Sequence, residues 1–216
     1  MPAKANALNI SRHFTESGKD PFDKLSWSKR DVEIRNFDGS VAFSMKDVNL
    51  PDNYSQVAAN VLAQKYLRKA GIPKKLRKVK EKAVPSWLQR SVPDLKSMEN
   101  LSEGEKFGEE IDGKQTFRRL AGTWTYWGWK HGYFASEEDA KAYFDEMCYM
   151  LAFQMVSPNS PQWFNTGLNW AYGIEGPAQG HYFVNPKTGD LERSVNAYEH
   201  PQPHACFIQS VSDDLV

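Results

Sequence analysis

The residues best suited to redox chemistry in this sequence are Cys206 and the histidine two positions before it, His204. In a regular strand, residues two apart point to the same face, so a strand over residues 205–211 would place the imidazole beside the thiol. A neighbouring imidazolium favours the thiolate over the thiol. A buried core thiol beside a satisfied histidine explains the same pair equally well. With His200 included, the three residues still lack a recurring zinc-ligand spacing, so a metal site is not favoured.

A second stretch suited to chemistry is residues 157–167, Ser-Pro-Asn-Ser-Pro-Gln-Trp-Phe-Asn-Thr-Gly. Turn-forming residues here stand beside two large aromatic residues, Trp163 and Phe164. This combination predicts a loop held against the core, with its hydroxyls, amides and backbone N–H groups in fixed positions. Such a loop suits a phosphate or a sugar. The alternative is the end of a helix followed by an ordinary packed connection.

Two helices are expected to position these stretches. Apolar and aromatic residues from Phe117 to His131 recur on one side of a helix, although the Thr and aromatic content of residues 123–129 mildly favours a strand. Residues 136–139, Ser-Glu-Glu-Asp, form a capping box for a second helix, which should bury Ala140, Phe144, Met147 and Leu151. Cys148 lies beside the apolar stripe of that helix, which predicts a small buried hydrophobe rather than a reactive thiol.

The N-terminal half is expected to consist of an arm, a hairpin, a helix and a linker. Residues 1–28 have no strong pattern and predict an extended or poorly ordered arm, whereas alternation over 31–35 and 41–45 predicts a hairpin. A helix should open at Asp52 or Asn53 and close at Gly71. Its apolar positions predict a core-facing stripe that ends with Tyr66.

Two further segments complete the expected organisation. Residues 74–82 contain six basic side chains, which could form a phosphate- or nucleic-acid-binding patch but are better explained as a solvated linker or helix face. Residues 85–113 are expected to be rich in loops. A second hairpin is predicted for residues 181–184 and 190–193, around an Asn-Pro-Lys-Thr-Gly turn.

Composition limits the class of protein. The chain has 216 residues, 13% of them aromatic, a mean hydropathy of −0.64 and a formal net charge of zero, so no overall field favours nucleic acid or an anionic membrane. No apolar run is long enough to span a membrane, and the N-terminus lacks the pattern of a secretory signal. Two cysteines make no disulfide framework. A cytoplasmic protein in a reducing environment is therefore expected.

Three long motifs occur in a fixed order: residues 119–129, Arg-Leu-Ala-Gly-Thr-Trp-Thr-Tyr-Trp-Gly-Trp; residues 158–168, which overlap the stretch above; and residues 202–209, Gln-Pro-His-Ala-Cys-Phe-Ile-Gln, followed by Asp-Asp-Leu at 213–215. With these motifs the chain resembles the N-terminal part of the large chain of adenosylcobalamin-dependent (class II) ribonucleotide reductases. The resemblance covers nearly the whole chain and is densest after residue 117.

The resemblance implies an α/β fold in which a mainly helical N-terminal region leads into the first strand of a ten-stranded α/β barrel, incomplete in this chain. Residues 1–113 would form the arm, hairpin, helix and basic linker. Residues 114–216 would form a helical layer, the phosphate-type loop and the first barrel strand. The family reduces ribonucleotides to deoxyribonucleotides with a cobalamin-generated thiyl radical and a cysteine pair, which an external dithiol such as thioredoxin re-reduces.

By motif match, Cys206 would be the first cysteine of the reducing pair, and Ser160 and Ala205 would contact the substrate. The cobalamin-binding residues, the radical cysteine and the partner cysteine have no match among these residues. The chain is therefore expected to be inactive alone and to act with the remainder of a reductase chain on a ribonucleotide, without a membrane or a specific nucleic acid as partner. The alternative is a non-catalytic module from a truncated reductase that binds a protein or a nucleic acid.

Overall fold

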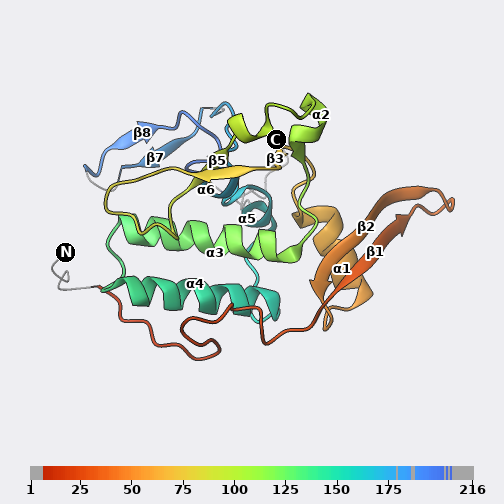
Figure 1. The fold of residues 1–216 in the computed structure, drawn as a ribbon, viewed down its shortest axis with the longest axis horizontal. Coiled ribbons are helices and arrows are strands. Elements are labelled where there is room, and N and C mark those ends of the chain that lie inside the picture. Colours follow the sequence, from red (N-terminus) through yellow and green to blue (C-terminus); the bar gives the residue numbers. More distant parts are fainter. Residues whose placement is uncertain (1–6, 179, 186–187, 202, 204, 206–216) are drawn as a thin grey trace, which may run out of the picture.

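Two long helices lie side by side at the centre of the chain and organise the rest of it (Figure 1). The computed structural model describes residues 7–178, 180–185, 188–201, 203 and 205. Helix α3 spans Gly113–Lys130 and α4 spans Glu137–Ala152, joined by a short turn. Both predicted helices are confirmed. Packing overrides the strand preference of the Thr- and Trp-rich run in α3 because the apolar side of that helix is buried.

Side chains at the starts of both helices satisfy backbone N–H groups that have no partner within the helix. Asp112 and Gln115 form a reciprocal capping box at α3. The Ser136 hydroxyl accepts a hydrogen bond from the Asp139 N–H at 3.1 Å, as the sequence predicts for α4. Cys148 is fully buried, and burial raises the pKa of its thiol well above the ordinary value. This cysteine is therefore the inert hydrophobe that the sequence predicts.

A single large core cluster joins both halves of the chain. It includes apolar side chains from the arm, the first hairpin, the following helix, α3 and α4. Its fully or nearly fully buried members include Phe22, Val32, Val48, Leu50, Leu62, Phe117, Leu120, Cys148 and Leu151.

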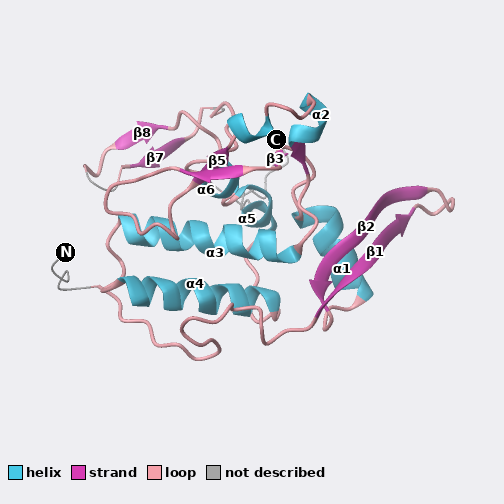
Figure 2. Cartoon of the chain, in the orientation of Figure 1, coloured by secondary structure: helices cyan, strands magenta, loops and turns pink. Residues whose placement is uncertain are grey.

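The predicted first hairpin is confirmed and is longer than the alternation suggested. Strand β1 (Trp27–Arg35) pairs antiparallel with β2 (Val41–Pro51), with register shifts near Asp31 and at Arg35. The tip extends away from the two central helices, and the base contributes its inward-facing residues to the core (Figures 1 and 2).

The helix predicted from Asp52 or Asn53 to Gly71 is shorter than expected and changes type. Ser55 caps α1 (Gln56–Val61), and the chain continues into a π-helical turn, η1 (Leu62–Tyr66). Residues 52 and 53 instead lie in the turn after β2. The wider turn ends when the Leu67 N–H reaches back to the Leu62 carbonyl, five residues earlier.

Three short antiparallel pairs of strands lie on the far side of α3 from α4. They are β3 (Ile72–Pro73) with β6 (Phe107–Gly108), β4 (Leu76–Lys78) with β5 (Ser91–Pro93), and β7 (Tyr182–Val184) with β8 (Leu191–Arg193). The β7–β8 hairpin confirms the second hairpin prediction. Between β5 and β6, the loop-rich segment contains only a 3₁₀ turn, η2 (Lys96–Met98), and one helical turn, α2 (Glu103–Lys106).

The N-terminal arm has no regular helix or strand over residues 7–26, as predicted, but it is held in place along α4 (Figure 1). The Glu146 carboxylate accepts hydrogen bonds from the backbone N–H groups of His13, Phe14 and Thr15. Phe22 inserts its ring into the core. The arm is thus an ordered part of the fold and not a loose extension.

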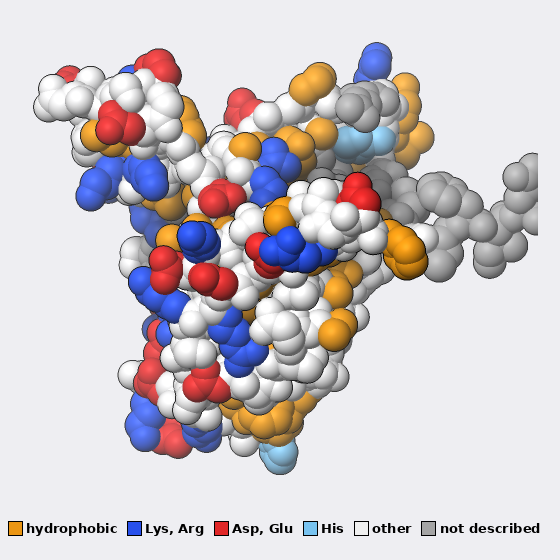
Figure 3. All heavy atoms as spheres, turned by 90° about the vertical axis from the view of Figure 1, so that its right-hand side faces the viewer, with side chains coloured by type: hydrophobic (Ala, Val, Ile, Leu, Met, Phe, Trp, Pro, Cys, Tyr) orange, Lys and Arg blue, Asp and Glu red, His pale blue; other side chains and the backbone are white. Residues whose placement is uncertain are grey.

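The described residues form a mixed α/β fold without a closed barrel, since each sheet among them has two strands. The expected first barrel strand, residues 205–211, lies outside the described residues except for Ala205, which is exposed and has no regular secondary structure. No helix in the described part of the chain is long and apolar enough to cross a membrane. The face on the side of the β1–β2 hairpin intermixes basic and acidic side chains, in keeping with the zero net charge (Figure 3).

Candidate active site

The candidate substrate-binding segment, residues 157–167, is mostly helical. Asn159 caps α5 (Ser160–Asn165) by accepting a hydrogen bond from the Gln162 N–H at 3.1 Å. The prediction of a loop is therefore wrong for residues 160–165, because the Asn cap and the proline next to it start a helix. The predicted anchoring holds for Trp163, which is buried, whereas Phe164 is 40% exposed.

Ser160, the first residue of α5, is exposed, and its hydroxyl lies 3.1 Å from the hydroxyl of Tyr66. The backbone of residues 161–163 has no free donor. Pro161 has no N–H, and the N–H groups of Gln162 and Trp163 both bond to Asn159. The exposed Ser160 hydroxyl therefore remains the candidate donor to an anion in this turn.

The start of α5 is tied to the third sequence motif. The Asn159 side-chain amide donates a 3.2 Å hydrogen bond to the carbonyl oxygen of Pro203, 44 residues further along the chain. Ala205 follows two residues later and is exposed. Cys206 and His204 lie outside the described residues, so their predicted pairing stays a prediction. The geometry nevertheless brings two of the three motifs together at one point of the surface.

The first motif supplies the support beneath α5. Arg119, in α3, is 1% exposed and forms an ion pair with the fully buried Glu110, Nε to Oε1 at 2.8 Å. Its Nη1 donates to the carbonyl of Thr166 at 2.7 Å, and its Nη2 donates to that of Trp163 at 2.9 Å. The guanidinium thus satisfies carbonyl groups at the C-terminal end of α5, where a helix leaves them without internal partners.

Glu110 is fully hydrogen-bonded in spite of its burial. Besides Arg119, its oxygens accept from the Arg68 N–H, the Thr116 hydroxyl and the Tyr172 hydroxyl, each at 2.8 Å. Burial alone would raise the pKa of the Glu110 carboxyl, but the Arg119 charge and these hydrogen bonds outweigh it and hold the pKa below the ordinary value. Tyr172 closes α6 (Leu168–Tyr172), and Arg119 Nη2 also donates to the Tyr66 carbonyl of η1 at 3.1 Å, so this network joins η1, α3, α5 and α6.

Sequence reasoning missed the Glu110–Arg119 pair as a structural centre. The available signal was a charged residue inside the apolar pattern of α3, between Phe117 and Leu120. Such a residue on a buried face requires a partner of opposite charge. The partner lies in a segment that the sequence identifies only as loop-rich, which is why periodicity alone does not pair the two residues.

Gly167, between α5 and α6, allows the closest backbone approach in the site. Its φ is +87°, and a Cβ placed there would overlap the carbonyl oxygen of Arg119. Only glycine fits both the left-handed conformation and the contact with α3. The final glycine of the second motif is thus explained by packing.

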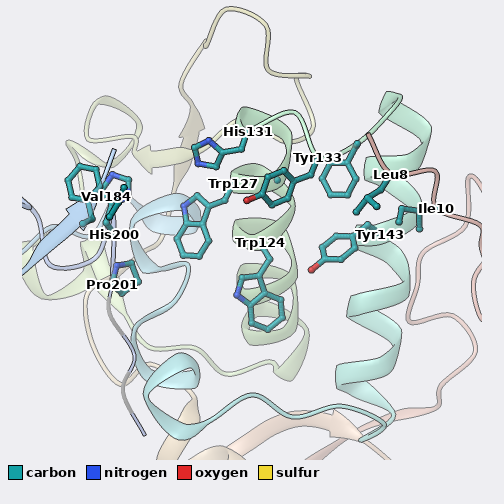
Figure 4. A pocket seen from close by; sticks show the side chains of 13 residues that line it. Leu8, Ile10, Trp124, Trp127, His131, Tyr133, Tyr143, Val184, His200 and Pro201 are labelled. Atoms are coloured by element: carbon teal, nitrogen blue, oxygen red, sulfur yellow. The ribbon is translucent and has the colours of Figure 1, made fainter. Parts of the chain in front are cut away.

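A large cavity lies further along α3 and does not include Ser160 (Figure 4). It measures about 620 Å³ and is lined mainly by aromatic and apolar side chains, among them Trp124, Trp127, Tyr133 and Tyr143. None of the described residues that line it is a lysine or an arginine, so it does not suit a nucleotide phosphate. Trp124 also reaches α5, where its Nε1 donates to the Gln162 side chain at 3.3 Å.

Within the basic run, residues 74–82, Lys78 makes contacts with other parts of the chain. Its ammonium group donates to the Gln89 carbonyl at 2.6 Å and lies 5.4 Å from the centre of the Trp170 ring. Burial lowers the pKa of Lys78. All six basic residues of the run are nevertheless exposed, and residues 76–78 form strand β4 and not a helix face.

Comparison with known proteins identifies the class of protein that carries these features. Residues 28–154 match the family model described as class II vitamin B12-dependent ribonucleotide reductase. The chain is 60% identical over 209 residues to the vitamin B12-dependent ribonucleotide reductase of Agrobacterium fabrum and 59% identical over 209 residues to that of Bradyrhizobium diazoefficiens. A third relative of the same name, from Rhodopirellula baltica, is 29% identical over 205 residues.

The chain belongs to the class II vitamin B12-dependent ribonucleotide reductase family, as its motifs indicated. The first two matches cover 97% of this chain, so they include Ser160 and the segment around Cys206, which the family model does not reach. The chain spans about a sixth of the length of these relatives, 16% and 17%.

We expect Gly167→Ala to destabilise the protein far more than Gly39→Ala. Both glycines have similar positive φ angles, +87° and +84°, but a Cβ at Gly39 meets no atom within 4 Å. Backbone strain alone should cost Gly39→Ala about 1–2 kcal/mol. The added overlap with Arg119 should raise the loss for Gly167→Ala above about 4 kcal/mol or prevent folding. Urea unfolding of both variants measures the difference, and equal losses would contradict the close approach.

The free energy of unfolding should fall as the pH is lowered below about 4.5, the ordinary pKa of the Glu110 carboxyl. In that range the Glu110 carboxyl binds a proton in the unfolded chain but stays ionised in the folded chain, where its pKa is lowered. Lowering the pH therefore favours unfolding. Urea unfolding at pH 7 to 3 should show a shallower pH dependence for Glu110→Gln than for the wild type. Glu109→Gln, at the exposed neighbouring position, is the control and should keep the wild-type slope.

Proposed function

We propose that this chain forms part of the substrate site of a ribonucleotide reductase that acts on ribonucleoside diphosphates. In this proposal Ser160 donates a hydrogen bond to the substrate phosphates, and the segment of Ala205 and Cys206 lies against the ribose. The observation that carries it is the hydrogen bond from the Asn159 side chain to the Pro203 carbonyl, because it joins the phosphate-type segment to the segment before the cysteine. A nucleotide has its phosphates and its ribose a few ångströms apart, so the two segments must be neighbours.

In this proposal the two parts of the chain, residues 1–113 and residues 114–216, have different roles. Residues 114–216 would carry the substrate-facing groups and lead into the first strand of the ten-stranded barrel. Residues 1–113 would support them, since Glu110 and the Tyr66 backbone hold the Arg119 guanidinium that carries α5.

The proposed chemistry assigns Cys206 to the reducing pair. Its thiol and a partner thiol from elsewhere in the complete enzyme would form a disulfide and supply two electrons and two protons. The 2′-hydroxyl leaves the ribose as water, and a hydrogen takes its place on the 2′-carbon. An external dithiol such as thioredoxin would then reduce the disulfide.

Adenosylcobalamin, the cofactor of this proposal, supplies the radical that starts the reaction when it is bound. By motif match, no cobalamin-binding residue lies in this chain, so we assign the cofactor to other parts of the complete enzyme.

In the complete reductase, Ser160→Ala should raise the KM for the ribonucleoside diphosphate by about 10- to 100-fold. A hydrogen bond to a charged group contributes about 1.5–3 kcal/mol, and about 1.4 kcal/mol corresponds to a factor of ten. Steady-state kinetics of deoxynucleotide formation measures the change.

Ser157→Ala is the matched control for Ser160→Ala. Ser157 is an exposed serine of the same segment, and its partner, the Trp163 indole N–H, keeps the Pro158 carbonyl as a second acceptor at 3.1 Å. An unchanged KM for Ser160→Ala would remove the phosphate site from the proposal.

The two cysteines of the chain should differ completely in their effect on activity. Cys206→Ser in the complete reductase should abolish deoxynucleotide formation, whereas Cys148→Ala should retain it, because Cys148 is sealed in the core. The 216-residue chain, whose cysteines are these two, should form no deoxynucleotide with adenosylcobalamin, a ribonucleoside diphosphate and a dithiol. Product from this chain, or from Cys206→Ser, would contradict the assignment.

A further inference from the structure

Tyr66 occupies a position that the sequence predicts only as part of a core-facing stripe. It is the last residue of the π-helical turn η1, half-buried, and its hydroxyl lies 3.1 Å from that of Ser160. The two residues are 94 positions apart in the chain. Single π-helical turns are uncommon and occur frequently at functional sites, because the wider turn changes the direction of the side chains that follow.

Three contacts limit the movement of the Tyr66 side chain. Its ring stacks on that of Trp163, with centroids 5.1 Å apart and an interplanar angle of 18°, and it also meets the Phe164 ring at 5.7 Å. Its backbone carbonyl accepts a 3.1 Å hydrogen bond from Arg119 Nη2. The same guanidinium donates to the carbonyl of Trp163, so one buried group holds the backbone of both residues.

The chemistry of a phosphate decides the direction of the hydrogen bond between the two hydroxyls. Phosphate oxygens only accept hydrogen bonds, so the single O–H of Ser160 must donate its hydrogen bond to the phosphate. The Ser160 oxygen can then accept a hydrogen bond from the hydroxyl of Tyr66. The resulting chain of hydrogen bonds runs from Tyr66 through Ser160 to the phosphate, and each bond in such a chain strengthens the next.

We propose that Tyr66 is a positioning residue of the substrate site, whose hydroxyl directs the Ser160 proton toward the phosphates. This inference rests on the proposed function, in which Ser160 binds the phosphates. The direction of the Ser160 hydroxyl matters because the three residues after it offer no free backbone donor: Pro161 has no N–H, and the N–H groups of Gln162 and Trp163 bond to Asn159.

The test is a double-mutant cycle in the complete reductase with Tyr66→Phe, Ser160→Ala and both together. Tyr66→Phe keeps the ring stacked on Trp163 and removes only the hydroxyl, so the melting temperature should change little. We expect it to raise the KM for the ribonucleoside diphosphate by about 3- to 10-fold, the effect of one neutral hydrogen bond. In the double variant the KM should match that of Ser160→Ala within about 2-fold, because Tyr66 acts through Ser160.

A second readout separates positioning from a general structural role. The inhibition constant of the matching ribonucleoside, which lacks phosphates, should be the same for the wild type and Tyr66→Phe. Tyr149→Phe is the control, since Tyr149 also stacks between aromatic rings, those of Phe14 and Phe153, at distances of 5.2 and 5.4 Å. It should leave the KM unchanged.

The possible results distinguish this inference from the function on which it rests. If Ser160→Ala raises the KM and Tyr66→Phe does not, the role of Tyr66 is overturned and the phosphate site stands. Additive effects of the two substitutions, or equal weakening of nucleotide and nucleoside by Tyr66→Phe, would also overturn it. If Ser160→Ala itself has no effect, both the phosphate site and the role of Tyr66 fall.

Discussion

The buried ion pair between Arg119 and Glu110 is the interaction on which the candidate site depends. Each charge is removed from water, so each requires the other and a complete set of hydrogen bonds, and loss of one partner from such a pair typically costs about 3–5 kcal/mol. The Arg119 guanidinium reaches carbonyl groups of η1 and of α5 and its C-cap, and Glu110 reaches α3 and α6. The geometric demands of one pair of charges therefore fix the relative positions of four elements.

The candidate substrate-binding segment rests on this support. The short helix α5 could not hold its place by its own hydrogen bonds, because a helix of six residues is marginal in water. Burial of Trp163, the contact of Gly167 with α3 and the Arg119 hydrogen bonds give it a fixed position. An exposed serine on a rigid helix end is a more accurate ligand than the same serine on a free loop.

The chain also separates a polar site from an apolar cavity along the same helix. Trp124 borders the cavity and donates to Gln162 of α5, so one side chain connects the two regions. The cavity is lined with aromatic side chains from α3, α4 and the turn between them and with Leu8 and Ile10 of the arm, and the described residues that line it include no lysine or arginine. The start of α5 is proposed as the substrate site on the chemistry of its donors and not on the size of a cavity.

The sequence by itself determined the features that depend on local patterns and motifs: the hairpins, the Ser136 cap, the buried Cys148, and the family through motifs that include Ser160 and Cys206. Local preferences act over a few residues, so sequence reasoning can read them. It did not foresee the π-helical turn before Leu67, and it treated residues 160–165 as a loop.

Only the tertiary structure decided which distant residues meet. The pairing of Arg119 with Glu110, the meeting of Tyr66 with Ser160 and the bond from Asn159 to Pro203 join segments that are 9, 94 and 44 residues apart. Such contacts arise because folding satisfies buried charges and polar groups wherever partners come within reach. Periodicity along the chain indicates which face of a helix is buried, but not which partner in another segment will satisfy a polar group on that face.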